Sequence, residues 1–242
     1  MSRAIPTLSL VVPAHDEEAN LPILVERTRS ALGTNGDWEL ILVDDGSRDG
    51  TASVIRSLAR DDSHVVGVFL ERNCGQSAAL AAGFLEARAE VIASLDADLQ
   101  NDPADIPLLV ERLPGHDAVV GFRANRHDTL VRRASSRIAN AVRNRLSHDS
   151  IRDTGCSLKV FRAEALRSIH WFDGMHRFLP TLLRYQGWSV LEVPVSHHPR
   201  HAGRSKYGIR NRALRAFVDL LGVRWMQSRR IRTPVREVIR GA

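Results

Sequence analysis

The stretch SLDADLQNDP at residues 94–103 places oxygen-bearing side chains at every second position after an apolar run. Alternation on an extended strand end would aim Asp96, Asp98 and Gln100 toward one side. Carboxylate and amide oxygens suit hard divalent cations such as Mg²⁺ or Mn²⁺, which commonly bind one or two carboxylates together with phosphate oxygens. The pattern therefore predicts a site at which a metal ion holds a phosphorylated ligand. The other role open to Asp98 and Asp102 is N-capping of a following helix.

Other charged groups follow short apolar runs elsewhere in the chain. PAHDE at 13–17 and DDGS at 44–47 add two acidic clusters, and GFR at 121–123 adds an arginine. In open α/β sheets ligands bind outside the carboxyl ends of the strands, which meet at one edge. Three acidic clusters at one edge repel one another unless a cation or hydrogen-bond donors lie among them. Helix capping alone is therefore an insufficient explanation of the acidic residues.

The elements that must position these groups follow from the hydrophobic pattern. Apolar or β-branched runs alternate with segments of helical spacing over the first 123 residues. This alternation predicts an α/β fold, a mostly parallel sheet with helices on both faces, whose first half is Rossmann-like and binds a nucleotide. The expected strands are 8–13, 39–43, 65–70, 91–95 and 117–122, and the expected helices are 20–32, 50–60, 76–88 and 104–113.

The pattern is less regular after residue 123. Strands are expected at 157–161 and 189–196, and helices at 129–147, 163–169, 177–186 and from about 209 onward. The last helix has an apolar face flanked by arginines, which makes it amphipathic. That face comprises Leu214, Phe217, Val218, Leu221 and Trp225.

Composition and charge limit the classes of protein. A chain of 242 residues with 43% hydrophobic content can bury one large core, or one core with an appendage. Its apolar runs fall short of the roughly 20 residues that cross a bilayer, so we expect no membrane span in it. Two cysteines, Cys74 and Cys156, without a secretory leader indicate reduced thiols and a cytoplasmic location.

The basic residues concentrate at one end. Residues 200–242 hold twelve arginines and lysines against two acidic residues, so this segment carries +10 and the rest carries −4 of the total +6. Such a segment favours an anionic partner, namely phospholipid headgroups, a phosphorylated substrate or nucleic acid, although a solvated basic face is the plainer alternative. Nucleic acid is the least favoured partner, because aromatic residues are sparse among the arginines and no binding motif is present.

Six motifs together resemble those of glycosyltransferase family 2: VVPAHDEEANL, ILVDDGSRDGT, RNCGQSAAL, SLDADLQNDP, GFR and HAGRSKYG. The resemblance covers roughly residues 8–210 and is closest to the dolichol- and polyprenyl-phosphate hexosyltransferase branch, which includes dolichol-phosphate mannosyltransferases. It implies a GT-A fold, a nucleotide-sugar donor (GDP-mannose or a UDP-hexose), a divalent metal cofactor (Mg²⁺ or Mn²⁺), and inverting transfer of a hexose to a polyprenyl phosphate.

The resemblance also implies roles on the donor side. Asp96, Asp98 and Gln100 match the metal and diphosphate site, with Asp98 and Gln100 as the expected direct ligands. His15 stands where the family often has Tyr, so stacking on the base is less firmly implied. The remaining matches are the nucleotide-contacting Pro13, His15 and Glu17, the base- or ribose-reading Asp44, and the loop expected to close over the diphosphate with Arg200, Ser205 and Lys206.

On the acceptor side, the resemblance places Arg123, Arg132 and Ser136 at the acceptor phosphate. A phosphate is already an oxyanion at neutral pH, so it needs positioning cations and no general base, and arginine can hold two of its oxygens. A solvated arginine is the other reading of Arg132. If the acceptor were instead a hydroxyl of a soluble glycan or lipid, Asp153 could serve as base; its simpler role is that of a turn residue. The expected catalytic set is Asp98, Arg123, Arg132, Ser136 and Lys206.

These assignments divide the chain into a catalytic domain and a tail. Residues 1–208 form the GT-A domain, in which 1–123 bind the nucleotide-sugar and 124–208 supply the acceptor side and the closing loop. Residues 209–242 form the basic amphipathic segment. We expect it to lie on the cytoplasmic leaflet with its apolar face down and its arginines on anionic headgroups, so that the enzyme is peripheral. The alternatives are that this face packs on the catalytic domain or binds a membrane partner subunit.

Overall fold

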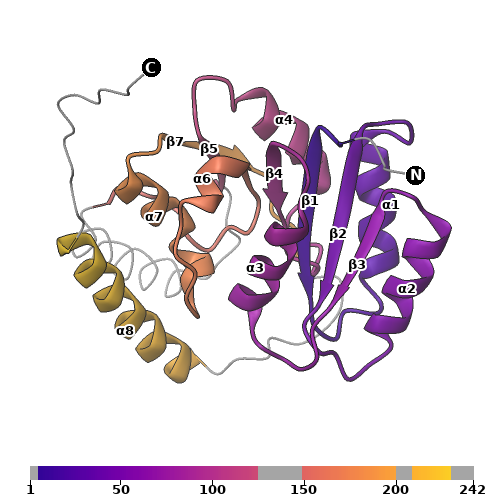
Figure 1. Ribbon diagram of the computed structural model, residues 1–242, viewed down its shortest axis with the longest axis horizontal. Coiled ribbons are helices and arrows are strands. Elements are labelled where there is room, and N and C mark those ends of the chain that lie inside the picture. The colour runs from indigo at the N-terminus through magenta and orange to yellow at the C-terminus, as the bar shows by residue number, and fades with distance from the viewer. Residues whose placement is uncertain (1–4, 125–148, 200–208, 230–242) are drawn as a thin grey trace, which may run out of the picture.

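Seven strands form one mostly parallel sheet in the order β3-β2-β1-β4-β6-β5-β7 (Figure 1). The computed structural model describes residues 5–124, 149–199 and 209–229, and side chains of the last range from residue 217 onward. All neighbouring strands pair in parallel except β6, which is antiparallel to both β4 and β5. The predicted sheet and its strands are confirmed. The bounds are β1 Leu8–Ala14, β2 Trp38–Asp44, β3 Val65–Phe69, β4 Val91–Ser94, β5 Ala118–Arg123, β6 Lys159–Arg162 and β7 Val190–Val195.

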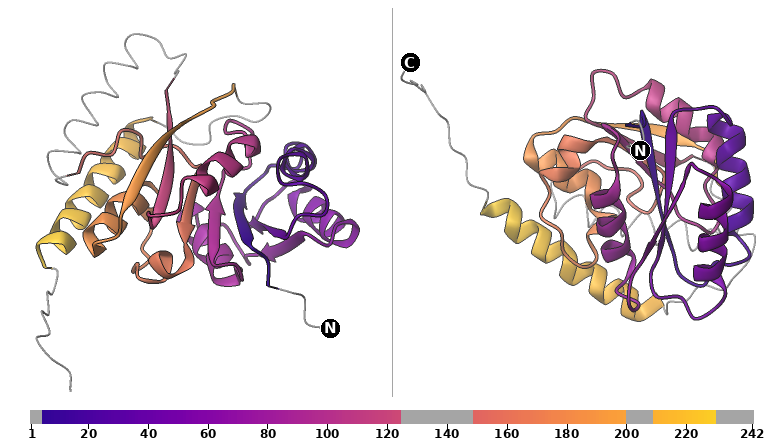
Figure 2. Two further views of the ribbon diagram at one scale, coloured as in Figure 1. Left: turned by 90° about the horizontal axis from the view of Figure 1, so that it is seen from above. Right: turned by 45° about the vertical axis from the view of Figure 1, so that its right-hand side comes forward.

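Helices cover both faces of the sheet, as the hydrophobic pattern predicts (Figures 1 and 2). The helix expected at 104–113 is in fact a 3₁₀ turn, η1, followed by a short α-helix, and the helix expected at 129–147 lies outside the described residues. The bounds are α1 Leu21–Leu32, α2 Thr51–Asp61, α3 Gln76–Glu86, η1 Pro103–Asp105, α4 Ile106–Glu111, α6 Ala163–Arg167, η2 Met175–Arg177, α7 Leu179–Gln186 and α8 Ile209–Ser228.

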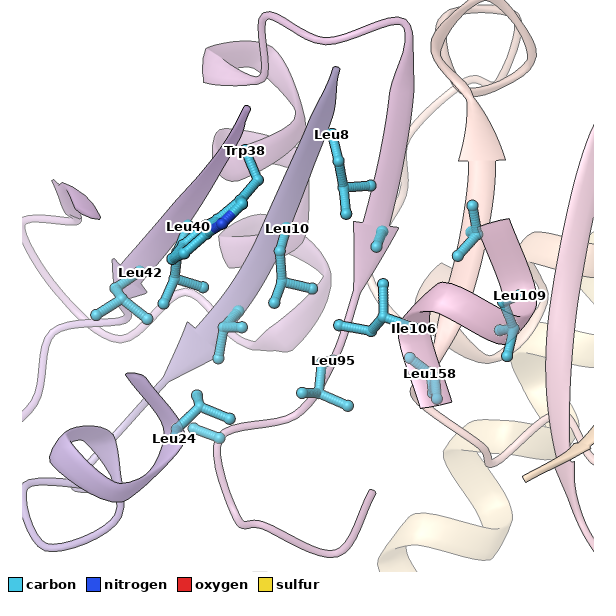
Figure 3. Close-up of a cluster of buried hydrophobic side chains, with 14 of the residues drawn as sticks. Leu8, Leu10, Leu24, Trp38, Leu40, Leu42, Leu95, Ile106, Leu109 and Leu158 are labelled. Carbon is cyan, nitrogen blue, oxygen red and sulfur yellow. The ribbon is translucent and has the colours of Figure 1, made fainter. Parts of the chain in front are cut away.

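Two apolar layers lie on opposite faces of the sheet because successive strand side chains alternate between them. On one face Leu10 packs with Leu24 of α1 and Ile106 of α4 (Figure 3). On the other face Val11 and Val43 pack with α3, and the same cluster continues through α6 and α7. The sheet is therefore held between two helical layers.

Helix α3 approaches the sheet closely at Gly83. A Cβ atom on this residue would lie 2.3 Å from Cγ1 of Val11 and 2.9 Å from Cγ2 of Val43. A side chain there would overpack the second layer. The glycine thus lets α3 lie directly on β1 and β2, which brings its first residue, Gln76, to the end of β4.

Helix α8 lies on the far side of the molecule from α2 (Figures 1 and 2). Its Leu220 and Val223 are buried in the second layer, whereas Phe217 and Leu221 are 46% and 47% exposed. The alternative in which the predicted apolar face packs on the domain is therefore wrong for these two exposed side chains. Among the described residues, no helix combines the length and apolarity needed to span a membrane.

Candidate active site

The charged strand ends predicted from the sequence come together at one edge of the sheet. The β1–β2 register pairs Ala14 with Asp44, and the β1–β4 register pairs Val11 with Ser94. The residues that follow β1, β2 and β4 therefore leave the sheet side by side. Because β5 is antiparallel to β6, as β4 is, the end of β5 lies at the same edge. The expected clustering of acidic groups at this edge is confirmed.

Asp96 is the most perturbed carboxylate among these strand ends. Its pKa is raised to about 6, chiefly by burial of its carboxyl group and also by the negative charges of Asp98 and Glu17. The Lys159 ammonium and a hydrogen bond with Ser157 act in the opposite direction. Its surroundings thus resist ionisation of a group whose ordinary pKa is 3.8. A cation at this position would instead favour the ionised form of the Asp96 carboxyl group.

The donor set fits a divalent cation that also binds phosphate. Asp96, Asp98 and Glu17 supply hard oxygen atoms, which Mg²⁺ and Mn²⁺ prefer. Within the described residues, no group of three or more His, Cys, Asp or Glu side chains could hold a metal ion by itself. Mg²⁺ usually keeps several waters and takes substrate phosphates besides one or two carboxylates. A metal completed by a diphosphate is the arrangement that this donor set allows.

The turn after β4 differs from the extended strand end that the D-x-D spacing suggested. β4 ends at Ser94, residues 97–98 form a turn, and Leu99 has a φ of 60° while its side chain is buried. The premise that strand alternation aims Asp96, Asp98 and Gln100 to one side is therefore wrong. The turn itself brings Asp98 close to Asp96.

Backbone strain marks the same edge of the sheet. Among the described residues other than glycine, the two with positive φ are Asp16, at 53°, and Leu99, at 60°. Such conformations persist where the surrounding structure imposes them, and they cluster at functional sites. One follows β1 and the other follows β4.

Gln100 and Asp102 have separate roles in the turn. The backbone N–H of Gln100 donates to Oδ1 of Asp98 at 3.2 Å, and its carbonyl accepts from the N–H of His198 at 2.8 Å. Asp102 accepts from the N–H of Ala104 at 3.0 Å, which caps η1. The capping role is thus confirmed for Asp102, while metal ligation by Asp98 and Gln100 stays a prediction.

The two carboxylates at the end of β2 accept hydrogen bonds from groups of the protein itself. Asp44 is buried and its Oδ1 accepts from the N–H of Ser47 at 3.1 Å. The buried Asp45 carboxylate accepts from the N–H groups of Cys74 at 2.7 Å and Gly75 at 3.0 Å, and from Nδ2 of Asn73 at 3.1 Å. No role for Asp45 follows from the sequence pattern alone. The glycine and asparagine of RNCG, typical of a tight loop, were the available signal.

The predicted nucleotide-contacting residues follow β1. Pro13 is the next-to-last residue of β1. The His15 ring lies with Nδ1 3.0 Å from the Asp45 carbonyl oxygen and Nε2 3.5 Å from Asp16. Glu17 accepts from Nδ2 of Asn20 at 2.5 Å. These contacts fix the segment at the sheet edge, and its role in nucleotide binding stays a prediction.

Arg123, at the end of β5, forms a two-point ion pair with Asp153. Nε lies 2.6 Å from Oδ2 and Nη2 lies 2.8 Å from Oδ1, and both side chains are mostly buried. Oδ1 also accepts from the N–H of Gly155 at 3.1 Å, which confirms Asp153 as a turn residue. Both carboxylate oxygens of Asp153 are thus engaged in holding Arg123, an arrangement that disfavours its use as a base.

Lys159 is a second residue that the sequence analysis did not assign to the site. It is buried in β6 opposite Ser94, and its ammonium donates to the Cys156 carbonyl. Burial lowers its pKa, and the nearby Asp96 carboxylate acts in the opposite direction. A single lysine in the apolar run SLKVF was the available signal.

Five predicted site residues, Arg132, Ser136, Arg200, Ser205 and Lys206, lie outside the described residues. The acceptor-phosphate pair and the closing loop therefore stay predictions.

Solved structures share this fold. Glucosyl-3-phosphoglycerate synthase from Mycobacterium tuberculosis, in complex with Mn²⁺, UDP and glucosyl-3-phosphoglycerate, superposes with a TM-score of 0.69 at 20% identity, covering 90% of this chain and 80% of that one. A mannosyltransferase from Pyrobaculum calidifontis, in complex with GDP-Man and Mn²⁺, gives a TM-score of 0.68 at 19% identity, covering 96% and 66%. The predicted GT-A fold is confirmed.

Curated relatives are more similar in sequence. The chain is 40% identical over 220 residues to an undecaprenyl-phosphate 4-deoxy-4-formamido-L-arabinose transferase from Shewanella sediminis, covering 90% of this chain. It is 43% identical over 223 residues to a dodecaprenyl-phosphate galacturonate synthase from Rhizobium johnstonii, covering 89%. The chain spans 66% of the length of each of these two relatives. Residues 9–169 match Glycosyl transferase family 2. The chain therefore belongs to glycosyltransferase family 2.

Proposed function

We propose that the chain transfers a sugar, with inversion, from a nucleotide-sugar to a polyprenyl phosphate, using Mg²⁺ or Mn²⁺ at the end of β4. The observation that carries the proposal is the Asp96 carboxylate, which lies partly buried beside Asp98 and Glu17 at the ligand-binding edge of the sheet. The names of the two curated relatives, both polyprenyl-phosphate sugar transferases, support the acceptor class.

The sugar is a finer proposal. A hexose carried by GDP or UDP follows from the resemblance of the motifs. The relatives are named for a galacturonate and a formamido-arabinose, so both sugars join the donors to be screened.

On the donor side, the chain must stabilise a nucleoside diphosphate that leaves with additional negative charge. A divalent cation held by Asp96 and Asp98 would supply positive charge at the diphosphate. Glu17 and His15 would hold the nucleotide end from β1, with Pro13 beside them and Asp44 reading the base or ribose from β2. Arg200, Ser205 and Lys206 would close over the diphosphate. Preorganised charge of this kind acts without proton transfer.

On the acceptor side, the chain must hold an anionic nucleophile in line with the sugar. Nε and Nη2 of Arg123 donate to Asp153, and this ion pair fixes the position of the guanidinium at the end of β5. Together with Arg132 and Ser136 it would position the acceptor phosphate. Direct attack by a phosphate oxygen on the face opposite the leaving group gives inversion and requires no base.

A hydroxyl acceptor, with Asp153 as base, is the second candidate function. The contacts of Asp153 with Arg123 and Gly155 weigh against it. Replacing Asp153 with Asn would abolish transfer to a hydroxyl, whereas transfer to a phosphate would be reduced only through Arg123. Nucleic-acid binding is a remote third candidate, and an electrophoretic mobility assay at physiological salt tests it.

The activity can be tested by screening GDP-mannose, UDP-hexoses, a UDP-uronate and a UDP-formamido-pentose with a short polyprenyl phosphate and Mg²⁺ or Mn²⁺. Transfer that requires the metal is the expected result. Asp98→Ala should lose transfer while keeping its fold by circular dichroism. Asp102→Ala is the matched control, because Asp102 belongs to the same stretch but caps η1. Equal activity of the two variants would refute the site.

We also propose that residues 1–208 are the catalytic domain and that 209–242 attach it to the cytoplasmic leaflet. Phe217, Val218, Leu221 and Trp225 are 46–63% exposed along α8, and the basic segment would meet anionic headgroups. A membrane partner subunit is the alternative occupant of this face.

Flotation of the full chain with liposomes tests the attachment. The chain should bind vesicles that contain anionic lipid and should not bind neutral vesicles. Phe217→Ser with Trp225→Ser should lose binding. Leu85→Ser should keep it, because Leu85 is 83% exposed on α3 and outside that face. Flotation of the double variant at the wild-type level would refute the attachment.

A further inference from the structure

Residues 72–76 connect the two acidic strand ends. The loop 72–75 follows β3, and its backbone is held by the buried Asp45 carboxylate through Cys74 at 2.7 Å and Gly75 at 3.0 Å. Asn73 adds a side-chain donor to the same carboxylate at 3.1 Å. Hydrogen bonds to a charged acceptor are stronger than those between neutral groups. The end of β2 therefore fixes the path of this loop.

Close packing adds to that constraint. Gly46, with a φ of 62°, lies directly against the loop, since a Cβ on it would lie 2.3 Å from the carbonyl carbon of Arg72 and 2.4 Å from the nitrogen of Asn73. Gly75 has a φ of 90°, a conformation that favours glycine. The loop thus enters α3 at a position set by β2.

The first residue of α3 contacts the end of β4. Nε2 of Gln76 donates to Oδ1 of Asp96 at 2.7 Å. The backbone N–H of Asp96 donates to Oγ of Ser157 at 3.2 Å, and that hydroxyl donates in turn to Oδ1 of Asn101 at 3.0 Å. A carboxylate with one oxygen in a short hydrogen bond has a defined rotamer. Gln76 therefore determines which way the other oxygen of Asp96 faces.

We propose that Gln76 is a positioning residue for the metal site and that Asp45 acts on that site through it. Gln76 orients the Asp96 carboxylate toward the cation, and Asp45 holds the loop that places Gln76. This inference rests on the proposed function, because it assigns the role of the Asp96 carboxylate to metal binding. Replacement of a residue that orients a ligand without touching the metal commonly lowers metal affinity by about 10- to 100-fold.

Removal of the donor is the first test. Gln76→Met keeps the side-chain length and removes the N–H. The affinity of the full chain for Mn²⁺ with GDP or UDP present, followed by the EPR signal of free Mn²⁺ and corrected for Mn²⁺ bound by the nucleotide alone, should fall about 10-fold. Its melting temperature without metal should match that of the wild type. Gln186→Met, an exposed substitution at the end of α7, is the matched control and should bind Mn²⁺ as the wild type does.

A double-mutant cycle separates positioning from a structural role. Asp45→Asn keeps an acceptor oxygen for the loop but loses the charge, and it should weaken Mn²⁺ binding less than Gln76→Met does. In the Gln76→Met background, Asp45→Asn should cause no further loss, because its effect passes through Gln76. Purely structural roles would make the two losses in Mn²⁺ affinity additive.

The possible outcomes distinguish a failure of the positioning role from a failure of the proposed function. Wild-type Mn²⁺ affinity in Gln76→Met, or additive losses in the cycle, would overturn the positioning role and leave the proposed transferase intact. A wild-type chain that binds no Mn²⁺ even with GDP or UDP present would overturn both. A loss in Gln76→Met with a non-additive cycle supports the inference.

Discussion

The ends of β2 and β4 carry similar acidic sequences, DDGS and DADL, and lie in different surroundings. At the end of β2, backbone and side-chain donors of the loop 72–75 satisfy Asp45. At the end of β4, Asp96 accepts the hydrogen bond of Gln76, but burial of its carboxyl group and the charges of Asp98 and Glu17 raise its pKa to about 6. A pair of carboxylates at a strand end is therefore no metal site by itself. The donors that surround each carboxylate distinguish Asp45, which holds a loop, from Asp96, the proposed ligand of a cation.

The largest expected effect separates the two ends by activity. Asp96→Asn removes a charge from the proposed metal and diphosphate site, so transfer should fall at least about 100-fold, more than loss of a group that merely orients a ligand. Steady-state transfer at saturating Mg²⁺ measures it. Asp61→Asn, an exposed change on α2, serves as control. Near-wild-type transfer by Asp96→Asn would remove the distinction between the two strand ends.

The next effect distinguishes the ends of β2 and β4 by the free energy of unfolding. Asp45→Asn weakens the charge-assisted hydrogen bonds that the loop 72–75 donates to a buried carboxylate, and we expect the free energy of unfolding to fall by about 2 kcal/mol. Urea denaturation at neutral pH measures it. If Asp45→Asn proved as stable as the wild type, the loop would be held by packing on Gly46 instead.

An effect of similar size but opposite sign is expected at the end of β4, where a substitution should raise the free energy of unfolding. The pKa of Asp96 is raised in the folded chain, so the folded state binds protons more tightly, and the metal-free chain loses stability as pH rises from about 4 to about 6. Asp96→Asn removes that loss and still accepts from Gln76. Metal-free Asp96→Asn should then exceed the wild type by about 2 kcal/mol at pH 7.5, allowing for partial exposure, and by little at pH 4. A constant difference between these pH values would contradict the raised pKa.

The smallest effect concerns Asp102, which the sequence groups with the β4 end. Asp102→Ala removes the cap of η1 and should cost about 1 kcal/mol of unfolding free energy. Transfer activity should not change. Thermal denaturation combined with the transfer assay tests both parts, and a loss of activity without a loss of stability would place Asp102 in the site.

The sequence allowed prediction of the strands and of the edge at which they deliver charge, because hydrophobic periodicity reports burial directly. The turn after β4 could not be predicted in the same way. Leucine seldom adopts a positive φ, and the conformation of Leu99 is imposed by its buried side chain and the surrounding structure. The contact of Gln76 with Asp96 likewise depends on α3 lying close to the sheet at Gly83.

The contacts of Lys159 and Asp153 could not be predicted from the sequence because they depend on the sheet topology. β6 enters the sheet antiparallel between β4 and β5, and this places Lys159 beside the end of β4, although 63 residues separate it from Asp96 in sequence. The ion pair of Arg123 with Asp153 depends on the same insertion. Sequence patterns identify the groups that carry charge, but long-range pairing decides which of them meet.

The most direct test of the central claim is the stabilisation that Mn²⁺ gives to the wild type, Asp45→Asn and Asp96→Asn. A ligand that binds the folded state raises the free energy of unfolding in proportion to the logarithm of its concentration over its dissociation constant. Urea denaturation with GDP or UDP present, with and without Mn²⁺, should show that gain for the wild type, a reduced gain for Asp45→Asn, and none for Asp96→Asn. An equal gain for Asp96→Asn and the wild type would contradict the assignment of the β4 end as the metal site.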